Sequence, residues 1–238
     1  LCADYSQIEP RIAASYAGEE ALQQVFRDGK DIYREIASSL FHIAPEKVDT
    51  QTRSKVKTMF LGLLYGMGGN ALQNRLADQG IETTLSEAKE LISKFKSTYP
   101  KLGGLIDEAG KLAREQKKVS GLVTVHTMTG RSIAIDAATA EESELRAHNF
   151  NHIIQGTGAD ILKRAAVEFH RRVREEGLRA QIVNLIHDEI LVEVLREDRD
   201  RARELLVDVM ETVGREVIGI DTPVECGVGS NWRIAKGE

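Results

Sequence analysis

Carboxylates at the ends of two predicted strands are the first candidates for chemistry. Asp4 follows an apolar run at residues 1–3, and Asp188 and Glu189 separate two runs rich in strand-forming residues. Tight hairpins favour Asn-Gly or Asp-Gly rather than Asp-Glu, and adjacent carboxylates repel each other unless a cation is near. Carboxylates at neighbouring strand ends suit Mg²⁺, which is commonly held by one or two carboxylates together with substrate phosphates. A solvated surface turn is the alternative.

A predicted helix over 52–65 concentrates cations in its first turns. Arg53, Lys55 and Lys57 lie where the helix dipole favours negative charge. A stripe of apolar residues at helical spacing predicts that another face is buried: Val56, Met59, Phe60, Leu63 and Leu64. Cations beside the exposed N–H groups of a helix start can bind a polyanion such as a triphosphate. The alternative is a solvated basic face.

Two further patterns concern helices. Ser6 and Glu9 have the spacing of a capping box, which predicts a helix start and by itself requires no substrate. Asn151 and Gln155 lie one turn apart on a predicted helix, so their amides share a face. Amides suit the minor groove of a duplex, where every base pair presents acceptors, although a polar surface pair is the alternative.

The elements that must position these residues are mainly helical. Two hairpins are predicted, one over residues 120–135 and one around Asp188. Short strands are expected at the start of the chain and near 223–228. The expected helices cover 18–41 in two pieces, 52–65, 84–97, 101–117, 140–176 with a break or bend near Gly156 and Gly158, and 197–217. Many helices and few strands, not strictly alternating, predict an α+β fold with a small antiparallel sheet.

Composition narrows the class of protein. The 238 residues are 42% hydrophobic and 29% charged, which is typical of a soluble globular protein, and no apolar run approaches the roughly 18 residues that span a bilayer. The two cysteines, Cys2 and Cys226, exclude a disulfide framework and a cysteine-built zinc site, and favour a reducing interior. With a net charge of −5, any contact with phosphates must come from a local positive patch.

Six motifs in the same order resemble those of the family A DNA polymerases, the DNA polymerase I type. Each motif alone is weak, but six in order are strong, and together they extend over essentially the whole chain. The matching segments are 4–11, 28–33, Arg53-(x3)-Lys57-(x7)-Tyr65-Gly66, 129–131, 151–157 and 185–189. The closing segment 228–232 resembles the C-terminus of the family.

The resemblance implies an architecture and a location. Residues 1–17 would form the first palm motif, 18–120 a helix-rich fingers subdomain, and 121–238 the rest of a palm built on a small antiparallel sheet. The activity implied is template-directed DNA synthesis from dNTPs on a primer-template, in the cytoplasm of a bacterium or a phage-infected host. The departures from the family pattern are more typical of phage or divergent bacterial members.

The resemblance also implies a role for individual residues. Two Mg²⁺ ions, with Mn²⁺ as a substitute, would be held by Asp4, the backbone carbonyl of Tyr5 and Asp188. Glu189 would be an accessory carboxylate and Lys57 a proton donor to pyrophosphate. The expected nucleotide-binding residues are Arg53, Lys57, Leu61, Tyr65, Glu9, Tyr33 and Gln7. The expected DNA contacts are Arg131, Asn151, Gln155, His187 and Gly66.

Several of these roles have alternatives. Core packing is the alternative for Tyr65, and a buried structural imidazole is the alternative for His187. Leu61 replaces a usual aromatic residue, Tyr33 a usual histidine and Pro10 a usual leucine.

The thumb and the early palm strands are not found in this sequence, so a separate or missing N-terminal segment is expected as a partner. Two rival functions are a single-subunit RNA polymerase and a non-catalytic DNA-binding fragment. Glu9 and residues 155–157 favour DNA synthesis over the first rival.

Overall fold

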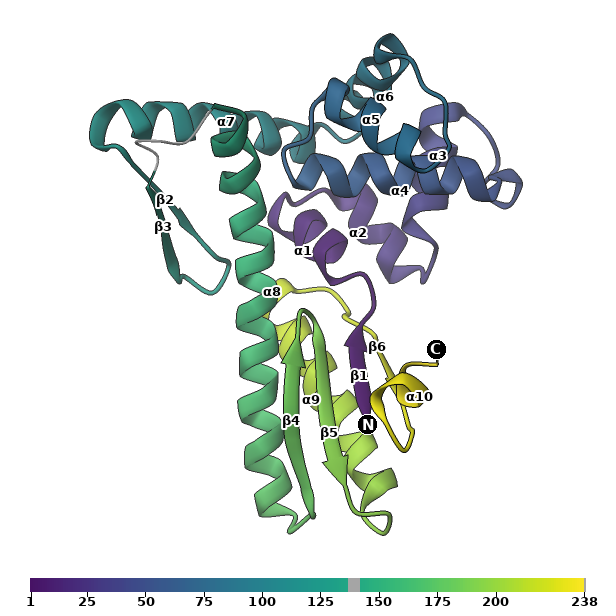
Figure 1. The fold of residues 1–238 in the computed structure, drawn as a ribbon, viewed down its shortest axis with the longest axis vertical. Coiled ribbons are helices and arrows are strands. Elements are labelled where there is room, and N and C mark those ends of the chain that lie inside the picture. Colours follow the sequence, from purple (N-terminus) through teal and green to yellow (C-terminus); the bar gives the residue numbers. More distant parts are fainter. Residues whose placement is uncertain (137–141, 238) are drawn as a thin grey trace. The chain divides into compact units, whose positions relative to one another are not determined.

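The protein is described by a computed structural model, drawn in Figure 1, which covers the backbone of residues 1–136 and 142–237 and the side chains of 1–136 and 149–237. The chain divides into two compact units. The first comprises Leu1–Ile12 and Gln155–Glu238, and the second comprises Ala13–Ile154.

Two helices pass from one unit to the other. Helix α1 (Ile8–Tyr16) and helix α8 (Glu142–Glu175) each contribute residues to both units. Helix α8 is continuous through Gly156 and Gly158, so the expected break does not occur there.

The first unit is built on an antiparallel sheet. Its remaining elements are β1 (Cys2–Tyr5), β4 (Ala180–Ile186), β5 (Glu189–Val194), α9 (Arg199–Ile218), β6 (Val224–Gly227) and α10 (Trp232–Lys236). The strands lie in the order β4-β5-β1-β6. Helix α9 packs on β1 and β6, and the hydroxyl of Tyr5 donates to the carbonyl of Met210 at 2.7 Å. The predicted hairpin around Asp188 is β4–β5.

The register of β1 brings acidic residues opposite one another. Asp4 pairs with Glu189 on β5 and with Glu225 on β6. Like charges placed directly opposite on neighbouring strands destabilise a sheet. This end of the sheet therefore departs from what stability alone would select, and such departures are common at functional sites.

The second unit is helical apart from the predicted hairpin. Its elements are α2 (Glu20–Arg27), α3 (Ile32–Phe41), the 3₁₀ turn η1 (Pro45–Lys47), α4 (Thr50–Leu64), α5 (Gly69–Asp78), α6 (Leu85–Thr98), α7 (Pro100–Ser120), β2 (Leu122–His126) and β3 (Ser132–Asp136). Four aromatic rings in successive contact, Tyr33, Phe60, Phe95 and Tyr99, link α3, α4 and α6.

The α+β fold class is confirmed, and local start signals explain the first residues of several helices. Asp31 and Asp49 cap α3 and α4, and Thr84 with Glu87 forms a capping box at α6. Helix α5 was not predicted. Among the residues that the structure describes, no helix is both long enough and apolar enough to cross a membrane.

Candidate functional site

Three carboxylates meet where β1 and β5 pair. Asp188 lies in the turn from β4 to β5 and directly precedes Glu189, the cross-strand partner of Asp4. The N–H of Tyr5 donates to the carbonyl oxygen of Asp188 at 3.3 Å, which joins the turn to β1. The charge of Asp188 raises the pKa of Asp4, so the two carboxylates are close enough to repel each other. The fold thus brings together carboxylates from the two ends of the chain, as the motifs predicted.

The turn itself consists of His187 and Asp188. The left-handed backbone, which a tight hairpin requires, falls on His187 with φ of 55° and not on the two carboxylates. The His187 side chain is exposed, which excludes the alternative of a buried structural imidazole. Glu189, by contrast, is the first residue of β5 and is buried.

Burial and mutual repulsion dominate the electrostatics of this carboxylate cluster, Asp4, Asp188 and Glu189. Burial, and then the charges of Asp188 and Glu189, together raise the pKa of Asp4 from 3.8 to about 6. Burial also raises the pKa of Asp188. Oδ1 of Asp4 and Oε1 of Glu189 are buried and, within the described residues, have no hydrogen-bond partner. Unpaired buried acceptors and clustered negative charge favour the binding of a cation.

The donor atoms fit a hard divalent cation. Asp4, Asp188 and the carbonyl of Tyr5 offer only oxygen, the donor type that Mg²⁺ prefers. The part of the chain that the structure describes contains no group of three or more His, Cys, Asp or Glu residues that could hold a metal ion. The arrangement therefore suits Mg²⁺ sites of the kind that are completed by water and substrate phosphates.

The corner between β1 and α1 differs from the predicted capping box. Helix α1 begins at Ile8, so Ser6 lies outside the N-cap position, and Gln7 adopts a left-handed φ of 57°. The Ser6 hydroxyl lies 3.4 Å from Oε1 of Glu225. Glu9 is half-buried in the first turn of α1, where the helix dipole favours a carboxylate.

In the second unit, the start of α4 holds the predicted cations. Asp49 accepts a hydrogen bond from the N–H of Thr52 at 2.7 Å, which supplies the negative charge that the helix start needs. Arg53 Nε donates to Oδ2 of Asp31 at 2.7 Å. Asp31 also caps α3 through the N–H groups of Tyr33 and Arg34, so one carboxylate both starts α3 and holds Arg53.

Tyr33 lies beneath the two predicted phosphate-binding cations. The Arg53 guanidinium carbon and the Lys57 ammonium lie 5.3 and 5.8 Å from the centre of its ring, distances suited to cation–π contact. The ring is buried and packs edge-on against Phe60. We call Arg53 and Lys57, with Tyr33 beneath them, the cation face of α4. A ring so well covered is better placed to support these cations than to contact a phosphate.

Lys55 lies on a different side of α4 from Lys57. Hydrogen bonds from Thr84 hold the pKa of Glu87 low, and the charge of Lys55 adds to this effect at the start of α6. The Lys57 side chain is exposed. The two lysines therefore have different neighbours although they are two residues apart.

The far end of α4 presents Leu61, Tyr65 and Gly66. Leu61 is half-buried, and Tyr65 is 38% exposed just after the last residue of the helix, so core packing does not account for Tyr65. Gly66 has φ of 72°, a conformation that strongly favours glycine, and it ends the helix. An exposed ring beside a glycine leaves room for a flat ligand at this end.

The predicted DNA contacts are dispersed. Arg131 is exposed beside β3, in the turn of the β2–β3 hairpin, and its backbone pairs with Thr127. Asn151 is half-buried and Gln155 is exposed, one turn apart on α8. Their accessibility agrees with either a groove contact or a polar surface pair, so both interpretations stay open.

Two residues of these sites were not predicted as such. Asp31 lies within the matching segment 28–33, and its N-cap position before α3 is a signal that could have identified it. Lys236 donates to Oε2 of Glu189 at 2.8 Å. No pattern in the sequence indicates that contact, because it depends on how α10 packs against the sheet.

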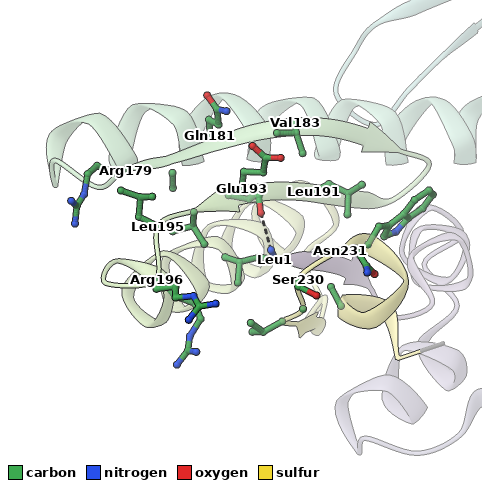
Figure 2. Close-up of a pocket in the computed structure, with 18 of the residues that line it drawn as sticks. Leu1, Arg179, Gln181, Val183, Leu191, Glu193, Leu195, Arg196, Ser230 and Asn231 are labelled. Atoms are coloured by element: carbon green, nitrogen blue, oxygen red, sulfur yellow. Dashed lines mark hydrogen bonds between the residues drawn. The ribbon is translucent and has the colours of Figure 1, made fainter.

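A separate cavity of about 1100 Å³ opens on one face of the sheet, as Figure 2 shows. None of the three clustered carboxylates lines it. It is bordered by Leu1, whose amino group donates to the carbonyl of Val192 at 2.7 Å, and by Val183 and Leu195. Charged and polar side chains line it as well, namely Arg179, Gln181, Glu193, Arg196 and Arg199. Val183 and Leu195 remain 48% and 51% exposed there. We call this surface the open sheet face.

Comparison with known proteins gives a consistent result. The sequence model of DNA polymerase family A matches residues 1–234. DNA polymerase I of Chloroflexus aurantiacus is 35% identical over 235 residues, which cover 98% of this chain and 24% of that protein. The thermostable DNA polymerase I of Thermus filiformis is 36% identical over 242 residues, covering 99% of this chain and 27% of that protein.

A solved structure agrees with the sequence relatives. The polymerase domain of Pol1 from M. smegmatis, in complex with DNA primer-template and dNTP, superimposes with a TM-score of 0.84 at 26% identity, over 99% of this chain and 40% of that one. The chain spans from 24% to 39% of the length of the curated relatives cited here and of the DNA polymerase I of Aquifex aeolicus. With a family match over nearly its whole length, this chain belongs to DNA polymerase family A.

Proposed function

We propose that this chain forms the nucleotidyl-transfer core of a template-directed DNA polymerase, which adds deoxynucleotides from dNTPs to a primer 3′-hydroxyl. The observation that carries the proposal is the convergence of Asp4 and Asp188, with a buried, unpaired oxygen and raised pKa values, at the junction of two strands. Such a cluster is unstable alone and is explained by cations that arrive with the substrate.

Asp4, Asp188 and the carbonyl of Tyr5 would hold the metal. When bound, Mg²⁺ or Mn²⁺, proposed here as two ions, would supply activation of the primer hydroxyl and neutralisation of the departing pyrophosphate. The chain itself supplies the fixed positions of these oxygens, because Asp4 is held within a paired strand and Asp188 is tied to that strand through Tyr5. Glu189 would be an accessory carboxylate beside Asp4 and Asp188.

The cation face of α4 would bind the triphosphate. Arg53 is held by Asp31 and Tyr33, so its guanidinium is oriented before the nucleotide arrives. Lys57 is exposed and is free to reach a phosphate oxygen, and its ammonium can give a proton to pyrophosphate as it departs.

Other residues would select the nucleotide and hold the duplex. Glu9, at the corner after β1, would exclude a ribose 2′-hydroxyl, and the neighbouring Gln7 would contact the nucleotide. Tyr65 with Leu61 would cover the base. The remaining contacts proposed with DNA are those of Gly66, Arg131, Asn151, Gln155 and His187. The exposure of His187 and Arg131 supports this assignment.

The open sheet face favours the proposal that a further polypeptide segment covers it. The relatives contain at least as much additional length as this chain has, and two exposed apolar side chains, Val183 and Leu195, line the cavity. We infer that a polypeptide segment equivalent to the thumb and early palm covers this face, either within one chain or as a separate one. Val183→Ser with Leu195→Ser should weaken its binding, whereas Val167→Ser, an exposed control on α8, should not.

Primer extension tests the proposal directly. The chain is assayed with a primer-template, Mg²⁺ and either dNTPs or rNTPs, alone and with a polypeptide that supplies the thumb segment. We expect weak, salt-sensitive extension alone, strong extension with the added segment, and preference for dNTPs that Glu9→Ala reduces. Preference for rNTPs would favour the RNA polymerase alternative. DNA binding without extension in any combination would favour the non-catalytic one.

A further inference from the structure

Helix α10 is seated on the sheet that carries the carboxylate cluster. A Cβ atom added at Gly227 would lie 1.7 Å from the carbonyl oxygen of Ala235, and one added at Gly229 would lie 2.4 Å from its nitrogen. Only glycine permits so close an approach of two backbones. Ala235 also packs in an apolar cluster with Cys2 and Leu191. The position of α10 relative to β1 and β5 is therefore closely determined.

The packing of α10 places the Lys236 ammonium beside the buried carboxylate of Glu189. Nζ of Lys236 lies 2.8 Å from Oε2 of Glu189, whose side chain is 3% exposed. The Lys236 ammonium also lies 5.8 Å from the centre of the Trp232 ring on the same helix. A carboxylate buried to this degree is strongly unfavourable without a paired cation. Lys236 is the cation that allows an ionised Glu189 to occupy this place.

The charge of Lys236 extends beyond its direct partner. It opposes the burial and repulsion that raise the pKa of Asp4, and it opposes the burial that raises the pKa of Asp188. Among the described residues, Lys236 is thus a cation that the fold pairs directly with one of the three carboxylates. The charge of His187 also lowers the pKa of Asp188. Helix α10 therefore contributes to the carboxylate cluster in two ways, through the charge of Lys236 and through the packing of Ala235.

We propose that Lys236 is a positioning residue of the carboxylate cluster, which holds Glu189 in place through its ion pair and partly shields Asp4 and Asp188 until divalent cations bind. The catalytic consequence rests on the proposed function, whereas the ion pair and its shielding do not. A purely structural role, in which Lys236 only stabilises the end of the chain, makes different predictions.

The first test is Mn²⁺ binding to the chain without DNA or nucleotide. Lys236→Ala removes a positive charge near the site, so Mn²⁺ should bind several-fold more tightly. Lys236→Arg should resemble the wild type. Arg233→Ala is the matched control, because it removes the same charge from the same helix and should leave the affinity unchanged. Equal affinities for Lys236→Ala and Arg233→Ala would overturn the shielding role.

The second test is the kinetics of nucleotide addition, in the presence of the thumb-supplying polypeptide. Because Glu189 is no longer held, Lys236→Ala should lower kcat about tenfold, the change that corresponds to about 1.4 kcal/mol, while KM for dNTP changes less than twofold. Lys236→Arg should recover most of the rate. Tighter Mn²⁺ binding combined with slower synthesis is a combination that loss of stability alone does not produce.

A third measurement needs neither metal nor activity, and so separates this inference from the proposed function. Lys236→Ala should lower Tm by several degrees, but by much less in a Glu189→Gln background, because a neutral amide needs no paired cation. An equal loss of Tm in both backgrounds would show that the ion pair does not act, and the inference would fail even if the chain is an active polymerase.

Discussion

The carboxylate cluster and the cation face of α4 differ in how far the fold satisfies their charges. Arg53 is bonded to Asp31, and both Arg53 and Lys57 lie over the ring of Tyr33. In the cluster, one oxygen each of Asp4 and Glu189 is buried without a hydrogen-bond partner among the described residues. The cation face is compensated within its own helices, whereas the cluster is compensated only in part, by Lys236.

This difference predicts how each region responds to change. A region whose charges repel is stabilised when one charge is removed, and it loses its function at the same time. A region whose charges are locally paired loses little stability when one exposed charge is removed, because exposed ion pairs contribute only about 0–1 kcal/mol. Stability and activity should therefore change in opposite directions in the cluster but not on the cation face.

The largest effect is expected from Asp4→Asn or Asp188→Asn. Each should lower the rate of nucleotide addition by at least about 10²–10³, the scale of losing one major electrostatic contact in catalysis. Each should also raise Tm in the absence of metal, because repulsion within the cluster is relieved. Single-turnover kinetics and thermal melting in a chelator measure both. A variant with near-normal rate would exclude that residue from the chemistry, and a fall in Tm would contradict the account of repulsion.

On the cation face, Lys57→Ala should have the next largest effect. We expect a loss of rate of roughly tenfold or more, since Lys57 is proposed both to bind phosphate and to donate a proton. The Kd for primer-template should change little, because its partner is the nucleotide. Lys55→Ala is the matched control on the same helix, and its effect should be mild because Lys55 lies toward Glu87. Equal losses for the two lysines would favour a solvated basic face.

A smaller effect is expected at Asp31. Asparagine is as good an N-cap as aspartate, so Asp31→Asn should keep the start of α3 while it removes the ion pair with Arg53. With its guanidinium less firmly held, Arg53 should bind triphosphate less well, and KM for dNTP should rise a few-fold with little change in Tm. Asp31→Ala adds the loss of the cap, about 0.5–2 kcal/mol. If KM is unchanged in Asp31→Asn, Asp31 is only a cap.

The fold could be predicted well wherever its signals are local. The β2–β3 and β4–β5 hairpins and most helices follow from residues that are close in sequence, whereas the capping box predicted at Ser6 and Glu9 differs from the observed start of α1. Helix α5 was missed because Gly68 and Gly69 read as a loop, although Leu72 and Leu76 provide its buried face. Helix α8 is not broken at Gly156 or Gly158, because a glycine destabilises a helix by only about 1 kcal/mol.

The candidate site could be predicted only in part, for the same reason. Asp4 and Asp188 are recognisable because carboxylates at strand ends repel each other. Arg53 and Lys57 are recognisable because a helix start favours negative charge. Their catalytic and binding roles stay predictions. The contact of Lys236 with Glu189 depends on the close packing of α10 on β6, and no local pattern encodes it. The residues proposed to contact metal or substrate were thus easier to identify than Asp31 and Lys236, which pair with them.

The smallest expected effect is a pH-dependent difference in Tm between the metal-free wild type and Asp4→Asn. In the folded chain, burial and then the charges of Asp188 and Glu189 raise the pKa of Asp4 from 3.8 to about 6. The folded state therefore favours the protonated acid, and its stabilising contribution is present at low pH and is lost as the pH rises from about 4 through about 6. Asp4→Asn does not titrate there.

The Tm of Asp4→Asn minus that of the wild type should therefore increase between pH 4 and pH 6 and level off above it. Acid effects on the rest of the chain are common to both proteins and cancel in the difference. Adding Mg²⁺ at pH 7.5 should reduce the difference, since a bound cation neutralises the repulsion that asparagine removes. A cation added to the locally paired α4 region has no such repulsion to relieve, so Lys57→Ala should show no Mg²⁺-dependent change in Tm relative to the wild type. A difference in Tm for Asp4→Asn that is independent of both pH and Mg²⁺ would show that the cluster is not under electrostatic strain, and would remove the distinction between the two regions.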